Sequence, residues 1–72
     1  MITPVFVFRT SVTHQKEVNY LRPLLNALVD CKGRWNFDLD DCDNILRVEA
    51  KEPHPEIISS ALQAQGFLCE EL

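Results

Sequence analysis

The residues best suited to chemistry are carboxylates clustered near the middle of the chain. Four aspartates fall between Asp38 and Asn44, and Glu49 follows at the spacing of an EF-hand calcium loop that would begin at Asp38. Such a loop needs an oxygen ligand at its fifth position and a glycine at its sixth, where this chain has Cys42 and Asp43. A solvated hairpin turn, in which Asp and Asn side chains accept hydrogen bonds from nearby backbone, is therefore the better interpretation.

A nucleophile paired with a base is the next chemistry to consider. His14 follows the hydroxyl-bearing stretch Thr10–Thr13, but a catalytic site also needs an orienting group and an oxyanion pocket, and 72 residues leave little volume for such a cleft. Cys42 lies among aspartates, and negative charge nearby disfavours the reactive thiolate. We therefore predict no enzymatic activity and no cofactor.

Length and composition define the broad class. With 72 residues, 46% of them hydrophobic and 25% charged, the chain is predicted to fold as one globular domain, residues 1–72. Its net charge of -4 disfavours binding to nucleic acid or to anionic lipid. The longest apolar runs, such as Pro4–Phe8 and Leu24–Val29, are too short to span a membrane, and no signal peptide precedes them, so we expect a cytoplasmic protein that contacts no membrane.

The cysteines are consistent with that compartment. Cys31, Cys42 and Cys69 are three in number and widely spaced, which indicates reduced thiols rather than a disulfide framework. No Cys-x-x-Cys pair occurs, so we expect these side chains to serve as small apolar groups rather than as zinc ligands.

The first part of the chain predicts a strand and a helix. The run Pro4–Arg9 is apolar, β-branched and aromatic, which is typical of a strand that is apolar on both faces. Helical spacing then predicts a helix with Thr13 as its N-cap and Lys32-Gly33 as its end, in which Pro23 should cause a kink or irregular first turns. The apolar positions of this helix are Val18, Leu21, Leu24, Leu25 and Leu28.

The second part predicts a hairpin, a helix and a final strand. Strict alternation over residues 34–39 and 44–50 predicts two strands joined by the polar turn 40–43. A helix from Pro55 to Gln65 follows, because proline is favoured at the first helical position and Gly66 supplies the end. A last short strand begins at Phe67–Cys69.

This order of elements predicts a ferredoxin-like βαββαβ fold of the α+β class. The split βαβ arrangement packs both helices on one face of a four-stranded antiparallel sheet. Right-handed crossovers then bring the loop Thr10–His14, the hairpin turn and the Gln65-Gly66 turn to one end of the domain.

The layout resembles the heavy-metal-associated domains of copper chaperones and metal-transporting pumps over nearly the whole chain. The shared features are the apolar first strand, the helix that opens at the first loop, the charged hairpin, and a second helix ending in Gly66-Phe67. The Met-x-Cys-x-x-Cys loop, whose two thiolates hold Cu(I) in that family, is missing here. The resemblance therefore implies the fold and argues against thiolate metal binding.

Aligning the first helix with that family places His14 and Glu17 where the two cysteines would be. This pair suits an ion harder than Cu(I), and the acidic turn would lie at the same end of the domain. A metal-ion or small-ligand carrier is therefore the alternative function. Its candidate residues are His14, Glu17, Asp40, Asp41 and Asp43.

The favoured function is a non-enzymatic binding or interaction module. Both helices cover one face of the sheet, while the first strand is apolar on both, so the other face would expose an apolar patch with a polar rim. A protein partner, or a second copy in a homodimer, would cover that open face. The candidate contact residues are Phe6, Phe8, Ile45, Arg47 and Leu68. Coverage of the patch by long side chains in a monomer is the competing interpretation.

Overall fold

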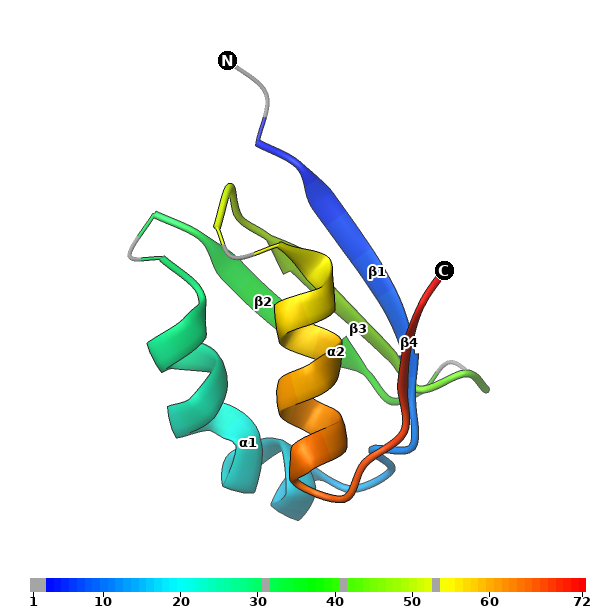
Figure 1. Cartoon of the computed structure of the whole chain (residues 1–72). Coiled ribbons are helices and arrows are strands. Elements are labelled where there is room, and N and C mark those ends of the chain that lie inside the picture. The colour runs from blue at the N-terminus through cyan, green and yellow to red at the C-terminus, as the bar shows by residue number, and fades with distance from the viewer. Residues whose placement is uncertain (1–2, 31, 41, 53) are drawn as a thin grey trace.

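Four strands and two helices follow one another in the predicted order (Figure 1). The computed structural model describes residues 3–30, 32–40, 42–52 and 54–72. The elements are β1 (Val5–Thr10), α1 (Gln15–Leu28), β2 (Arg34–Asp38), β3 (Ile45–Glu49), α2 (Pro55–Ala64) and β4 (Cys69–Glu71).

The strands form one sheet in the order β2-β3-β1-β4, and each neighbouring pair is antiparallel. Both helices lie on the same face of this sheet, as Figure 1 shows. The predicted ferredoxin-like βαββαβ fold is therefore confirmed as a four-stranded antiparallel α+β sandwich. Its outer strands are β2 and β4, and its central strands are β3 and β1.

The core lies between the helices and the sheet. Phe8 of β1 is opposite Leu46 of β3, which in turn is opposite Phe37 of β2, so these three side chains share the face that the helices cover. α1 contributes Val18, Leu21 and Leu25, and α2 contributes Ile58 and Leu62. The alternation predicted for β2 and β3 is thus the one that the structure uses.

α1 differs from its prediction at both ends. Its N-cap is His14 rather than Thr13, and it ends at Leu28 rather than at Lys32-Gly33. Gly33 has another role, because a Cβ there would lie 2.7 Å from Val29 Cγ1 and 2.9 Å from Ala50 Cβ. The glycine lets the connection to β2 pass close to β3. The helix continues through Pro23, which removes one backbone donor without ending it.

The end of α2 agrees with its prediction. Gly66 has φ 91°, a left-handed conformation that glycine adopts without strain. The Phe67 N–H donates to the Leu62 carbonyl at 3.1 Å, which satisfies one of the last helical acceptors. β4 then begins at Cys69, two residues beyond the predicted Phe67.

The three turns predicted to share one end do meet there. The Thr10 N–H donates to the Asp43 carbonyl at 3.2 Å, and the Thr10 hydroxyl donates to the Asn44 carbonyl at 2.7 Å. The Ser11 N–H donates to the Leu68 carbonyl at 3.1 Å, and Ser11 Oγ accepts from the Leu68 N–H at 2.9 Å.

Among the described residues, neither helix is long and apolar enough to cross a membrane.

Candidate functional site

The open face of the sheet is the surface that faces away from both helices. The cross-strand pairs define its members, because directly opposite residues in neighbouring strands share a face. Val7 of β1 is opposite Arg47 of β3, which is opposite Asn36 of β2. By the same alternation the open face also carries Val5, Arg9, Arg34, Asp38, Ile45, Glu49 and Glu70.

The placement of Phe6 and Phe8 on this open face was wrong. Phe8 is fully buried in the core, and Phe6 packs against the same core cluster. The strand is apolar along most of its length, so its sequence does not distinguish the two faces. Pairing with β3 does, because it sets Phe6 opposite Val48 and Phe8 opposite Leu46, both on the helix-covered side.

Ile45 and Arg47 lie on the open face as predicted. Arg47 is exposed there, whereas Ile45 is only 4% exposed although no helix covers it. In the register Ile45 lies between Arg9 of β1 and Asp38 of β2. Leu68 is about half exposed at the end of the sheet, next to Ser11.

Ion pairs cover much of the open face. The Arg9 guanidinium donates to Glu70 at 3.0 Å and joins β1 to β4. Arg47 lies 3.7 Å from Asp38, and Arg34 lies 3.6 Å from Glu49, and both of these pairs join β2 to β3. These exposed pairs contribute little stability individually, but the last two give the β2–β3 half of the face a charged surface with balanced signs.

Beyond the Arg9–Glu70 pair, the β1–β4 half of the open face is apolar. Val5 is 53% exposed and Val7 is half-buried beside it on β1. The Leu72 N–H donates to the Val7 carbonyl at 2.9 Å, and Leu72 is 67% exposed. By alternation with Glu70, Leu72 lies on the same face. We call Val5, Val7 and Leu72 the apolar strip.

Glu17, a candidate metal ligand, has a structural role. Its Oε1 accepts hydrogen bonds from the Thr13 N–H at 2.9 Å, the Thr13 hydroxyl at 3.3 Å and the His14 N–H at 3.3 Å. These bonds satisfy backbone donors at the start of α1, as in a capping box. The hydrogen bond from the Thr13 backbone is the main cause that lowers the pKa of Glu17.

The acidic turn behaves as a hairpin turn. Asp38 Oδ1 accepts from the Asp40 N–H at 3.2 Å, the local bond that Asp side chains make in turns. Asn44 adopts φ 51° at the entry to β3, a conformation that Asn tolerates well. Asp41 lies outside the described residues. Within the described residues no group of three or more His, Cys, Asp and Glu side chains could hold a metal ion.

The thiols differ in their surroundings. Cys69 is buried in the core, and burial raises the pKa of its thiol to about 11. Cys42 is exposed in the hairpin turn, and neither cysteine forms a disulfide. Cys31 lies outside the described residues. The prediction of an apolar core role therefore holds for Cys69 and is wrong for Cys42.

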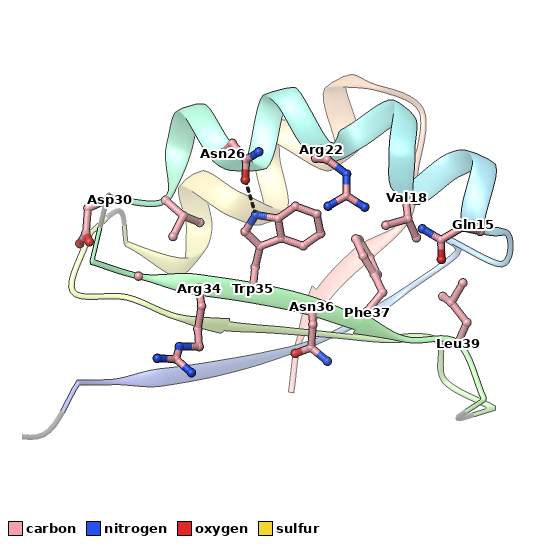
Figure 2. Close-up of a pocket in the computed structure, with 12 residues that line it drawn as sticks. Gln15, Val18, Arg22, Asn26, Asp30, Arg34, Trp35, Asn36, Phe37 and Leu39 are labelled. Carbon is pink, nitrogen blue, oxygen red and sulfur yellow. Dashed lines mark hydrogen bonds between the residues drawn. The ribbon is translucent and has the colours of Figure 1, made fainter.

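A groove between α1 and β2 is the feature that sequence reasoning missed (Figure 2). It has a volume of about 650 Å³. The Trp35 indole N–H donates to Asn26 Oδ1 at 2.9 Å, and the Arg22 guanidinium lies 5.4 Å from the centre of the Trp35 ring. Phe37 meets the same ring edge-on, with centroids 6.0 Å apart. These contacts hold Trp35 in a fixed position at the centre of the groove.

A sequence signal for this groove did exist. Arg22 and Asn26 are four residues apart on the predicted helix, so they form a polar row along one side of it. Trp35 alternates with polar residues and carries a donor that needs a partner when it is partly buried, although alternation alone does not say which face it takes. The position of the row relative to β2 depends on the tertiary structure, which the spacing does not give.

β2 itself has a free edge beside this groove. It is an outer strand, so one side of its backbone has no neighbouring strand in the described sheet. Unpaired N–H and C=O groups along such an edge can receive a further strand.

Comparison of the chain with protein-family models, with curated proteins and with solved structures gave no match. The resemblance to heavy-metal-associated domains therefore remains a prediction from the layout.

Proposed function

We propose that this protein is a non-enzymatic protein-interaction module, with a layout like that of a heavy-metal-associated domain that lacks the thiolate loop. The apolar strip on the open face carries this proposal. Val5 and Leu72 are each more than half exposed, and Val7 lies on β1 with Val5 and accepts the Leu72 N–H at its carbonyl. Exposed apolar side chains grouped on one face and bordered by charged ones are typical of a contact surface.

The chemistry of the open face defines the partner. The charged residues beside the strip already pair with one another in Arg9–Glu70, Arg47–Asp38 and Arg34–Glu49. Neither sign of charge is in excess there, so the face would not select a strongly basic or acidic partner. It suits a protein surface with a small apolar centre and neutral or mixed polar groups around it.

The resolved pKa shifts have structural causes. The pKa of Glu17 is lowered by helix capping, and that of Cys69 is raised by burial in the core. The pKa of Arg9 is raised by its hydrogen bond to Glu70 on the sheet surface. Each shift has a structural cause, whereas a catalytic group has its pKa tuned inside a cleft where substrate can reach it.

A photocrosslinking experiment tests the proposal. A photoreactive amino acid at Val7 should give a discrete adduct with a protein of the host cell, while the same residue at Tyr20, exposed on α1, should not. The captured protein is then purified and titrated against the wild-type chain and two variants by calorimetry. Val7→Glu should weaken binding at least about tenfold, because it places a charge in the apolar strip, and Tyr20→Glu should leave it unchanged.

Two results would contradict the proposal. One is an adduct pattern at Val7 that is no different from that at Tyr20. The other is a purified partner whose affinity is the same for wild type and for Val7→Glu. Far-UV circular dichroism of each variant excludes unfolding as the cause of lost binding.

A further inference from the structure

The free edge of β2 carries a pattern that is complementary to itself. Its five residues, Arg34–Asp38, are in order basic, aromatic, polar, aromatic and acidic. Asn36 is at the centre, with Trp35 and Phe37 on either side of it and opposite charges at the two ends. Reversing the direction of the strand therefore sets unlike charges against each other.

We infer that a second copy of this chain pairs with β2, edge to edge and antiparallel, in the register that sets Asn36 opposite Asn36 of the second copy. Arg34 then faces Asp38 of the second copy, and Asp38 faces Arg34 of the second copy. Trp35 faces Phe37 of the second copy on the helix-covered side. The two sheets join into one of eight strands, twice the four of a single chain.

The charges select this register over its neighbours. A shift of one residue would set an open-face side chain opposite a helix-face side chain, which a continuous sheet does not allow. Moving the centre to Trp35 would leave Arg34 opposite Asn36, and moving it to Phe37 would leave Asp38 opposite Asn36. Among the five residues of β2, opposite charges face each other only in the register centred on Asn36, which forms two such pairs, and these pairs stabilise antiparallel strands.

The edge is accessible and its end charges can accept another partner. Figure 2 shows Arg34 and Asn36 pointing away from α1, while Trp35 and Phe37 point toward it. The Arg34 side chain is 80% exposed. Arg34 lies 3.6 Å from Glu49, and Arg47 lies 3.7 Å from Asp38. Both distances are longer than the 3.0 Å hydrogen bond from Arg9 to Glu70. An opposite charge across the seam could therefore be accommodated.

In this arrangement the groove between α1 and β2 lies beside the contact between the two copies. The twofold axis is perpendicular to the joined sheet, so both copies of α1 lie on the same face and flank the seam. Trp35 is held by Asn26 and Arg22 before any partner arrives, so its position needs no ordering on association. Trp35 is also the single tryptophan of the chain, and its fluorescence would report the contact directly.

A mixing experiment tests the inference with two variants of this chain, Arg34→Asp and Asp38→Arg. Each variant alone places like charges opposite each other twice across the seam. Mixed in equal amounts, the two variants form a pair in which both contacts again join opposite charges. Sedimentation equilibrium from micromolar to millimolar protein should show a dimer for the wild type. For each variant alone the dissociation constant of the dimer should rise at least about tenfold, and in the mixture it should return toward the wild-type value.

Recovery of the dimer in the mixture distinguishes a contact between the two β2 edges from effects inside each monomer, because the mixture contains the same two folded chains as the separate samples. Arg9→Asp is the matched control, since it breaks an open-face ion pair away from β2 and should leave the dimer unchanged. A mixture no more dimeric than its components would overturn the inference, as would a wild type that is monomeric at millimolar concentration.

Hydrogen exchange of the wild type tests the same seam without any substitution. Alternate β2 amides, whose N–H groups point away from β3, should become protected as the protein concentration rises. Protection that does not depend on concentration would contradict the inference. If Val7→Glu instead abolishes the dimer and the mixture shows no recovery, the copies meet through the open face, so the edge pairing fails while the proposed function stands.

Discussion

The two faces of this sheet remove apolar side chains from water in different ways. On the helix-covered face, Phe8, Leu46 and Val48 are almost completely removed from water by apolar packing. On the open face, three ion pairs lie over the β-strands, and Ile45 is buried there although no helix covers it. Apolar packing should provide most of the stability, since exposed ion pairs contribute little. The open face is therefore free to change in sequence, and available for contacts, at little cost to the fold.

The largest expected effect is in the core under α1. Leu25→Ala should lower the free energy of unfolding by about 2–5 kcal/mol, because it removes a fully buried side chain and leaves a cavity. Val7→Ala on the open face should lower it by less than about 1 kcal/mol. Urea denaturation followed by Trp35 fluorescence measures both. Equal losses would contradict the division between the two faces.

If Leu25→Ala does not fold, Ile58→Val provides the graded version. It removes one methylene from a fully buried side chain of α2 and should cost about 0.5–1.5 kcal/mol. Ile57→Val is the matched control, because Ile57 is exposed on the same helix and should change stability very little.

A smaller loss of stability is expected at Gly33, where the backbone lies close to Val29, Ala50 and the Glu49 carbonyl. Gly33→Ala should destabilise the domain by about 1–3 kcal/mol, because the new methyl would overlap Val29 and the Glu49 carbonyl oxygen. Gly66→Ala has nothing within 4 Å to meet, so its cost should come from the positive φ alone and be about 1 kcal/mol. Thermal unfolding compares the two variants, and a larger loss for Gly66→Ala would count against the packing explanation.

Stability should also depend on pH through Glu17. Its pKa is lowered from 4.5 in the folded state, so the carboxylate contributes stability above pH 4.5 that is lost as the pH falls through the lower folded value. Glu17→Gln should therefore be less stable than wild type at pH 7, with a difference that shrinks toward strong acid. Chemical denaturation at a series of pH values checks this. A difference that stays constant with pH would show that the charge of the cap does not matter.

The ion pairs of the open face should have a weaker effect still. A double-mutant cycle on Arg47 and Asp38 should give a coupling energy below about 1 kcal/mol that decreases with added salt. A salt-independent coupling above about 2 kcal/mol would mean that the open face contributes to the fold as strongly as a packed surface.

The smallest expected response is to metal ions. Native mass spectrometry with Cu(I), Zn(II) or Ca(II) should show no stoichiometric uptake, because the described residues bring together no group of three or more His, Cys, Asp and Glu side chains that could hold an ion. One bound ion, lost on replacing His14 or Asp40, would revive the carrier function.

Much of the fold followed from local pattern. The period of two in residues 34–38 and 45–49 and the helical spacing from Val18 to Leu28 depend on backbone geometry, so they predicted the elements and which residues of β2 and β3 share a face, but not which of the two faces the helices cover. The first strand lacks an apolar–polar alternation along most of its length. Its inward set, Phe6 and Phe8, became known only through pairing with β3, which is a long-range contact.

The candidate surfaces were harder to predict for the same reason. The early end of α1 and the role of Gly33 depend on how closely the connection to β2 passes Val29 and Ala50. The groove depends on how far α1 lies from β2. Helix spacing identified neither, because lateral distances between elements are set by side chains that are far apart in the sequence.

The order of the strands has a consequence for how the domain folds. β2 and β3 are neighbours along the chain, so their hairpin closes only a short loop. The pairing of Phe8 with Glu71 joins β1 to β4 across most of the sequence, and the entropy lost in closing such a loop must be repaid by contacts that form afterwards. We expect the hairpin to form early and β4 to dock late, so Cys69 would be the last core side chain to leave the solvent.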